Sequence, residues 1–317
     1  MSNKDKYRRF CENNVDVSIF SLDWWLDAVS QNDNWDVLIV EKNGLILGTL
    51  PYLIRKKYGM TFIIMPPLTQ TLGPWIRPSK AKRDVEREAE EIAIMKELIE
   101  QIPQHSYFHQ NFHYSITNHL PFYWKGFQQA TRYTYVIENL EDLQSIWNDM
   151  RTNVKGHINA AQRRFNLEVK SDLSIDDFLN INELSFKRQG RSLPYSRDIV
   201  RRIDDACQKH NCRKMFFARD TKGRIHSAVY LIWTPISAYN LMSGSDPDLR
   251  NSGANSLCIW EAIKFASTVS KSFDFEGSMI ESIGHFFRAF GAKRMQYLQI
   301  TKTNSALLRF AQHFRPI

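Results

Sequence analysis

The chain has 317 residues, of which 43% are hydrophobic and 24% are charged, and its formal net charge is +8. This composition is ordinary for a soluble globular protein with a sizeable core, and the length suggests roughly two domains. The sequence has no apolar run of the ~20 residues that span a bilayer and no signal-peptide core at its start. We therefore expect a cytoplasmic protein.

Charge and cysteine content bear on the partners and cofactors. The positive excess favours anionic partners such as phosphates, nucleotides, acidic lipid headgroups or RNA, although solubility alone explains it equally well. The four cysteines lack the spacing of a disulfide framework, and Cys207 with Cys212 has no second pair to complete a metal site. The sequence therefore predicts no metal.

The first half of the chain opens its sheet with a hairpin pattern. Two alternating apolar runs, 35–41 and 45–55, flank Asn43-Gly44, a pair that favours a tight turn between strands. The elements predicted next are a helix at 80–102 and a strand at 106–116.

The second half repeats this order of elements. Three strands are predicted at 213–220, 224–233 and 237–244, followed by a helix at 255–270 and a strand at 272–277. The halves also end alike, with a helix end, a short connection and a strand. We therefore predict an α+β fold built from two copies of one unit, residues 1–140 and 141–317.

A basic segment and an irregular loop lie between the repeated elements. Residues 145–170 are predicted to form a helix that runs into a strand, and the basic residues of the helix are Arg151, Lys155, Arg163 and Arg164. The loop 187–198 is rich in polar side chains, and such loops often carry function, although a solvated loop is the alternative. The candidates for substrate binding are Lys155, Arg188, Gln189 and Tyr195.

Several segments resemble a known family. DPDLRNSGANSLCIWEAIKFA and FDFEGSMIESIGHFFRAFGAKRMQYL resemble the Fem-type (FemAB-like) branch of the GNAT acyltransferase superfamily. MRTNVKGHINAAQRRFNLEV looks like the basic helix that opens the second module in that branch, and FKRQGRSLPYS resembles a loop of its bacterial members. The resemblance covers nearly the whole chain. It implies two tandem GNAT-like modules, each a mixed, mainly antiparallel sheet flanked by helices.

The resemblance also implies a donor site. In GNAT proteins a Gln/Arg-x-x-Gly-x-Gly/Ala loop opens a helix whose backbone N–H groups hold the phosphates of the donor. Arg250, Gly253 and Asn255 match this loop, although Asn255 departs from the expected Gly or Ala and Ala254 stands one place early. These four residues are the candidate donor-binding residues, and an N-cap role for Asn255 is the alternative. Residues 1–140 lack such a loop, so we predict no donor site there.

Two acids end the strand predicted at 272–277. Alternation places Phe273 and Phe275 on one face and Asp274 and Glu276 on the other. If the phenylalanines are core, the acids face a cleft or solvent, where a carboxylate can act as general base toward an amine. We therefore name Asp274 and Glu276 as candidate catalytic residues.

The helix after these acids offers a structural alternative and a further candidate. Ser278 and Glu281 have the spacing of a capping box, so the acids could instead stabilise this helix. His285 on the same helix is a third catalytic candidate. The resemblance implies a tyrosine proton donor four residues before the helix-ending Gly291, but Phe287 stands there.

Together these features predict an N-acyltransferase. As the resemblance implies, GNAT enzymes move an acyl group from coenzyme A to an amine, whereas Fem-type members use aminoacyl-tRNA and a peptidoglycan precursor. We expect acyl-CoA as donor, or aminoacyl-tRNA, and an amine acceptor on a small molecule, a sugar nucleotide or a cell-envelope precursor. The alternative is a non-catalytic RNA- or phosphate-binding protein on a degenerate GNAT scaffold.

Overall fold

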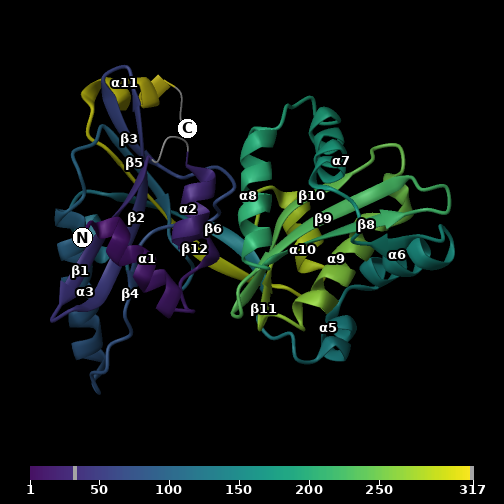
Figure 1. Ribbon diagram of the computed structural model, residues 1–317, viewed down its shortest axis with the longest axis horizontal. Helices are drawn as coiled ribbons and strands as arrows, with labels where there is room; N and C mark the ends of the chain where they lie inside the picture. The colour runs from purple at the N-terminus through teal and green to yellow at the C-terminus, as the bar shows by residue number, and fades with distance from the viewer. Residues whose placement is uncertain (31–33, 315–317) are drawn as a thin grey trace. The chain divides into compact units, whose positions relative to one another are not determined.

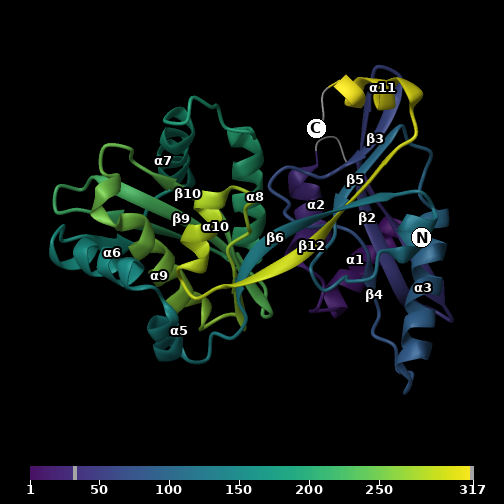
Figure 2. The same cartoon turned by 180° about the vertical axis from the view of Figure 1, so that it is seen from behind.

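The computed structural model describes residues 1–30 and 34–314, and the chain divides into two compact units (Figures 1 and 2). Unit 1 contains Met1–Arg132 together with Gln296–Ile317, and unit 2 contains Tyr133–Met295. This division differs from the predicted one at residue 140. Strand β12 (Lys293–Thr303) leaves unit 2 and pairs with β5 (Tyr107–Asn111) in unit 1, so the chain end returns to the first unit.

Unit 1 is a mixed sheet with helices on its two faces. Its strands follow the order β1-β2-β3-β5-β12, with β4 on β2, and all these pairs are antiparallel except β3–β5. Its other elements are α1 (Asn3–Asn13), η1 (Ile19–Ser21), α2 (Asp23–Val29), β1 (Trp35–Lys42), β2 (Leu45–Lys57), β3 (Met60–Ile64), β4 (Trp75–Ile76), α3 (Asp84–Glu100), α4 (Leu120–Trp124) and α11 (Ala306–Phe314).

Local sequence explains how this sheet starts. Asn43 and Gly44 have φ values of 53° and 77°, so the predicted hairpin turn forms in the left-handed conformation that Asn-Gly favours. Alternation along β1 then divides its side chains between two cores. Trp35 packs with α1 and α2, whereas Leu38 packs with α3. The strand predicted at 106–116 is shorter than expected and ends at Asn111.

Unit 2 contains most of the sequence segments that resemble GNAT proteins. Strands in the order β6-β11-β10-β9-β8-β7 form its sheet, and only the β10–β11 pair is parallel. The elements are β6 (Gln128–Ile137), which enters from unit 1, α5 (Leu143–Asp149), α6 (Thr152–Arg163), β7 (Glu168–Lys170), α7 (Ile175–Lys187), α8 (Arg197–Lys209), β8 (Arg213–Arg219), β9 (Ile225–Trp233), β10 (Ser237–Ser245), η2 (Arg250–Ser252), α9 (Ala254–Ala266), β11 (Ser272–Asp274) and α10 (Glu281–Arg288).

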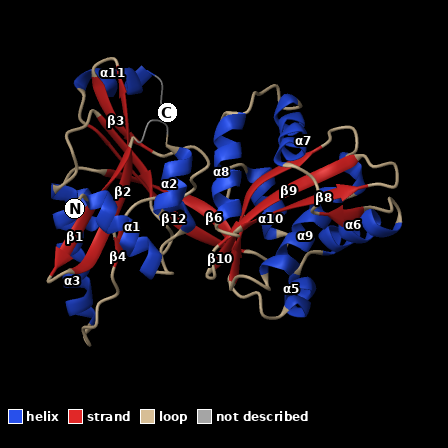
Figure 3. Ribbon diagram, viewed as in Figure 1, coloured by secondary structure: helices blue, strands red, loops and turns tan. Residues whose placement is uncertain are grey.

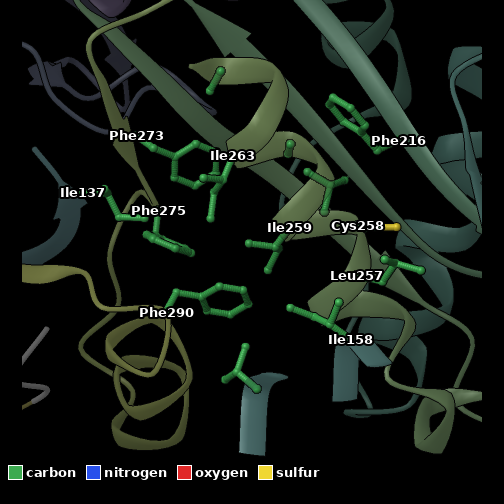
Figure 4. Packing of buried hydrophobic residues seen from close by; sticks show 14 of the residues in the cluster. Ile137, Ile158, Phe216, Leu257, Cys258, Ile259, Ile263, Phe273, Phe275 and Phe290 are labelled. Carbon is green, nitrogen blue, oxygen red and sulfur yellow. The ribbon is translucent and has the colours of Figure 1, made fainter. Parts of the chain in front are cut away.

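Helices cover both faces of this sheet (Figure 3). Phe216 of β8 belongs to the core formed with α6 and α9, whereas the next residue, Phe217, packs on Phe178 of α7. The first core continues to β11 and α10, where Phe273, Phe275 and Phe290 pack with α9 (Figure 4). The predicted α+β class, a mixed and mainly antiparallel sheet flanked by helices, is confirmed.

Strand β10 is paired with β11 over only part of its length. Strands β10 and β11 pair over only three residues each, from Ser237 with Ser272 to Tyr239 with Asp274. Strand β10 then continues to Ser245, and its register against β9 shifts between Asn240 and Met242. A bulge of this kind bends a strand and changes the direction of its side chains. The second half of β10 therefore extends beyond the end of β11.

Candidate active site

The two predicted acids lie at the end of β11, but not as alternation suggested. Asp274 is buried with 1% of its surface exposed, so it does not face an open cleft or solvent. The strand ends at Asp274, and Glu276 adopts a left-handed backbone conformation with φ 58°. The expectation that Asp274 faces a cleft or solvent is therefore wrong, and the period-two pattern does not apply to Glu276, because the strand ends before this residue.

Asp274 is held by two hydrogen bonds. Its Oδ1 accepts the hydroxyl of Thr134 on β6 at 2.5 Å and the backbone N–H of Glu276 at 2.7 Å. Burial raises the pKa of Asp274 to about 7, although both hydrogen bonds favour the ionised form. Asp274 therefore titrates near neutral pH and fixes the turn that carries Glu276.

Glu276 has the features of a poised base. The residue as a whole is partly exposed, but its Oε1 is buried and finds no hydrogen-bond partner in the described parts of the chain. Burial, and then the charge of Asp274, raises the pKa of Glu276 well above its ordinary value. A non-glycine residue held in the left-handed region and a buried carboxylate oxygen without a partner both mark candidate functional sites.

Residues distant in the sequence contribute a hydroxyl and an amide to this region. The hydroxyl of Tyr195, just before α8, donates to Oδ1 of Asn182 on α7 at 2.9 Å, and Nδ2 of Asn182 donates to the carbonyl of Ser243 on β10 at 2.8 Å. Burial raises the pKa of Tyr195, and the charge of Glu276 adds to the rise. Tyr195, one of the predicted substrate-binding residues, therefore lies within electrostatic reach of Glu276.

The Tyr195→Phe substitution tests the hydrogen bond between Tyr195 and Asn182. It removes the hydroxyl group that donates a hydrogen bond to Asn182, so we expect the free energy of unfolding to fall by about 1 kcal/mol. Urea denaturation of the variant measures this loss. An unchanged unfolding midpoint would show that the hydrogen bond between Tyr195 and Asn182 adds nothing to stability.

The predicted donor loop forms a tight turn before α9. Gly253 has φ 75°, and a Cβ placed on it would lie 2.2 Å from the backbone oxygen of His157 on α6, so only glycine fits there. Gly253 is itself the N-cap of α9, which makes the alternative N-cap role of Asn255 wrong. The Asn255 side chain instead accepts from the Ser227 hydroxyl at 3.4 Å.

The loop presents backbone amides rather than side chains. Gly253, Ala254 and Asn255 open α9, and the first N–H groups of a helix have no carbonyl partner within the helix. Ala254 is buried, whereas Arg250 is exposed one turn earlier in η2. This arrangement suits an anionic group, because the N-terminus of a helix carries a partial positive charge.

Comparisons with known proteins agree with this geometry. Residues 148–277 match the family model of the acetyltransferase (GNAT) domain. The fold is similar to a crystal structure of FemX, with a TM-score of 0.69 and 12% identity over 93% of this chain and 95% of that one. It is also similar to a tandem GNAT protein of the clavulanic acid biosynthesis pathway, with a TM-score of 0.54 and 10% identity over 94% and 93% of the two chains.

A third similar structure is the C-terminal domain of a putative lysylphosphatidylglycerol synthetase from Agrobacterium fabrum. Its TM-score is 0.55 and its identity 12%, over 98% of this chain and 96% of that one. No curated protein is significantly similar in sequence. At these identities the structural similarity establishes the fold. The chain has a Fem-like tandem GNAT fold. The resemblance inferred from the sequence is thus confirmed.

Phe287, which follows the matched GNAT segment, has no group that can donate a proton. It packs on Phe275 with ring centres 4.9 Å apart and lies 6.3 Å from the ring of Tyr135 on β6. The Tyr135 hydroxyl reaches the same helix, since a Cβ on Gly284 would lie 2.6 Å from it. Sequence reasoning missed Tyr135 because β6 precedes the GNAT domain match by more than ten residues.

The other predicted catalytic and substrate-binding residues of unit 2 show no contact with the acids in the described part of the chain. His285 is exposed and bonds within α10, to Glu281 at 3.4 Å and Arg288 at 2.8 Å. Lys155 donates to the carbonyl of Asn148 at 2.9 Å, Gln189 donates to that of Ser185 at 3.1 Å, and Arg188 is exposed at the end of α7. No contact with Asp274 or Glu276 is found for these four in the described residues.

Helix α10 also corrects the predicted capping box. The helix begins at Glu281 with Ile280 as its N-cap, and Ser278 accepts the N–H of Ile280 at 3.0 Å instead of capping a helix. Because Glu276 and Gly277 form a left-handed turn, the helix begins only at Glu281. The acids therefore do not serve the capping role that was their structural alternative.

Neither a metal-binding cluster nor a membrane-spanning helix is found among the described residues. No cluster of three or more histidine, cysteine, aspartate or glutamate side chains has the arrangement of a metal site in residues 1–30 and 34–314. Over the same residues, none of the helices combines the length and the apolar character that crossing a bilayer requires.

Proposed function

We propose that this protein transfers an acyl or aminoacyl group from a carrier to an amine, with Glu276 as the general base. The observation that carries the proposal is the buried Oε1 of Glu276, which has no partner among the described residues and lies at the end of a central strand of the GNAT domain. A proton acceptor in this position suits an acceptor that arrives as an ammonium ion.

The transfer requires Glu276 to remove a proton from the acceptor amine. An amine attacks the carbonyl carbon of the donor only after it has lost a proton, and the Glu276 carboxylate takes that proton. In the empty site burial and the charge of Asp274 raise the pKa of Glu276 and so favour its protonated form. A bound ammonium ion favours the carboxylate form, because an opposite charge nearby lowers the pKa of an acid. The leaving group of the carrier departs as an anion and can take up the proton held by Glu276, while the second proton that the nitrogen loses on forming the amide goes to solvent. Tyr195 keeps its proton and its hydrogen bond to Asn182.

The turn before α9 is the proposed binding site of the acyl carrier. Its backbone amides at Gly253, Ala254 and Asn255 would hold anionic phosphates of acyl-CoA, with aminoacyl-tRNA as the second carrier. One protein of similar fold is named a lysylphosphatidylglycerol synthetase, a name that refers to an aminoacylated lipid. This name supports an acceptor of the cell-envelope class. A sugar nucleotide is the second acceptor class that we propose, and the proposed site of action is the cytoplasm.

The pH dependence of kcat/KM tests the base. Activity requires ionised Glu276, whose pKa is raised, so kcat/KM should rise with pH through a range above that of an ordinary glutamate. The measurement is a pH–rate profile with an acyl-CoA and an amine whose own ionisation is subtracted. An acid limb near the usual pKa of glutamate, about 4.3, would contradict a buried base.

Binding measurements test the carrier. Titration calorimetry with coenzyme A should show saturable binding, and the bound ligand should raise the melting temperature. Tight RNA binding that weakens steeply with salt, without any effect of coenzyme A, would instead favour the non-catalytic alternative.

A further inference from the structure

The backbone turn at Glu276 is held from β6. Glu276 and Gly277 both have left-handed φ values, 58° and 63°, and a Cβ on Gly277 would lie 2.3 Å from the carbonyl oxygen of Tyr133. The left-handed region is strained for a glutamate and persists only when the surroundings impose it. The β6 segment at Tyr133 and Thr134 is therefore part of what shapes the site.

Both hydrogen bonds to Asp274 end on the same oxygen. Oδ1 accepts the Thr134 hydroxyl at 2.5 Å and the Glu276 N–H at 2.7 Å, and Thr134 and Asp274 are each only 1% exposed. Water therefore cannot replace the Thr134 hydroxyl easily. Because Oδ1 already accepts two hydrogen bonds, a proton on this carboxyl group belongs on Oδ2.

We propose that Thr134 is a positioning residue of the active site. By donating to Asp274, it fixes the carboxyl group that holds the Glu276 N–H, and so keeps the Glu276 side chain turned toward the acceptor amine. Thr134 itself touches neither donor nor acceptor. The inference rests on the proposed function only in assigning Glu276 as the base.

The charge of Asp274 also affects the pKa of Glu276. Thr134 from β6 donates to Asp274, and Tyr239 of β10 pairs with Asp274 in the sheet. Tyr195 from the loop before α8 interacts electrostatically with Glu276. The Thr134 hydroxyl favours the ionised form of Asp274, and that charge in turn opposes ionisation of Glu276.

The direction of the effect follows from this coupling. Without the Thr134 hydroxyl the pKa of Asp274 rises, so Asp274 stays neutral to a higher pH. Over that range Glu276 feels less repulsion and ionises at a lower pH. Loss of the hydroxyl should therefore move the acid limb of the pH–rate profile toward lower pH, while it also loosens the turn and lowers kcat.

The experiment compares Thr134→Val with Thr134→Ser. Valine keeps the shape of threonine but lacks the hydroxyl, and we expect kcat to fall about five- to tenfold, with the acid limb at lower pH and KM for the donor unchanged. Serine keeps the hydroxyl and should restore both kcat and the acid limb. Asp274→Asn keeps an acceptor for the Glu276 N–H without a charge, and it should shift the limb in the same direction.

Two kinetic results and one result from NMR would overturn the inference. One is a wild-type pH profile in a folded Thr134→Val protein. The other is a Thr134→Ser protein as impaired as the valine variant, which would assign the effect to the methyl group. Carbon-13 NMR titration of the carboxyl groups reads the Asp274 pKa without substrate. It should rise in Thr134→Val, and an unchanged titration would contradict the inference even if the proposed transfer activity itself failed.

Discussion

Replacing Glu276 with glutamine should lower kcat about 10²- to 10⁴-fold and leave donor binding intact. Glutamine has nearly the shape of glutamate, but its amide cannot take a proton from an ammonium ion, and general bases contribute rate factors of this size. Because Glu276 Oε1 has no hydrogen-bond partner in the described chain, the substitution breaks no existing side-chain contact of that atom. Steady-state kinetics with saturating donor measure kcat, and calorimetry measures the affinity for coenzyme A.

The matched control is Glu281→Gln. Glu281 lies five residues further along the chain in α10, and 90% of its side chain is exposed. This variant makes the same change of side chain without touching the buried acids, so its kcat should stay within about twofold of wild type, as expected for a surface substitution. Equal activity of Glu276→Gln and Glu281→Gln would remove Glu276 from the mechanism.

Replacing Gly253 with alanine should destabilise the protein by about 3 to 5 kcal/mol. The substitution places a side chain in the left-handed region, which costs about 1 to 2 kcal/mol. The new Cβ also lies 2.2 Å from the backbone oxygen of His157, so α6 and the turn before α9 must separate. Urea denaturation measures the free energy of unfolding.

Gly223→Ala separates the two contributions. Gly223 has nearly the same φ, 79°, but nothing lies within 4 Å of a Cβ placed there, so only the backbone strain remains. We expect Gly223→Ala to cost about 1 to 2 kcal/mol. If both variants lose the same free energy, the close approach of α6 to the donor turn does not restrict residue 253.

Local signals in the sequence predicted most strands and helices. Asn43-Gly44 places the first hairpin, because few other residue pairs adopt two successive left-handed conformations. The strands 213–220, 224–233 and 237–244 occur within two residues of their predicted bounds. The domain division was less predictable, because the pairing of β12 with β5 joins segments almost 200 residues apart, and no local pattern encodes that pairing.

The site was predicted in part, for similar reasons. Alternation at the end of a predicted strand pointed to Asp274 and Glu276, but it did not predict the burial of Asp274 or the left-handed turn at Glu276, which is a property of the folded backbone. Thr134 and Asn182 carried no sequence signal, because an isolated threonine or asparagine is common in any strand or helix. Their roles appear only when β6 and α7 bring them to Asp274 and Tyr195.

The most direct test of the account is whether coenzyme A thiol is released only when an amine is present. The purified protein is incubated with an acyl-CoA and a panel of amines, among them amino sugars, sugar nucleotides and cell-envelope precursors, and free thiol is measured with and without each amine. We predict amine-dependent thiol release together with an acylated amine detected by mass spectrometry, and loss of both in Glu276→Gln. Amine-dependent thiol release that persists undiminished in Glu276→Gln would contradict the proposed mechanism. If thiol release is absent for every amine, and aminoacyl-tRNA is not deacylated by the same panel, the proposed transferase function is contradicted.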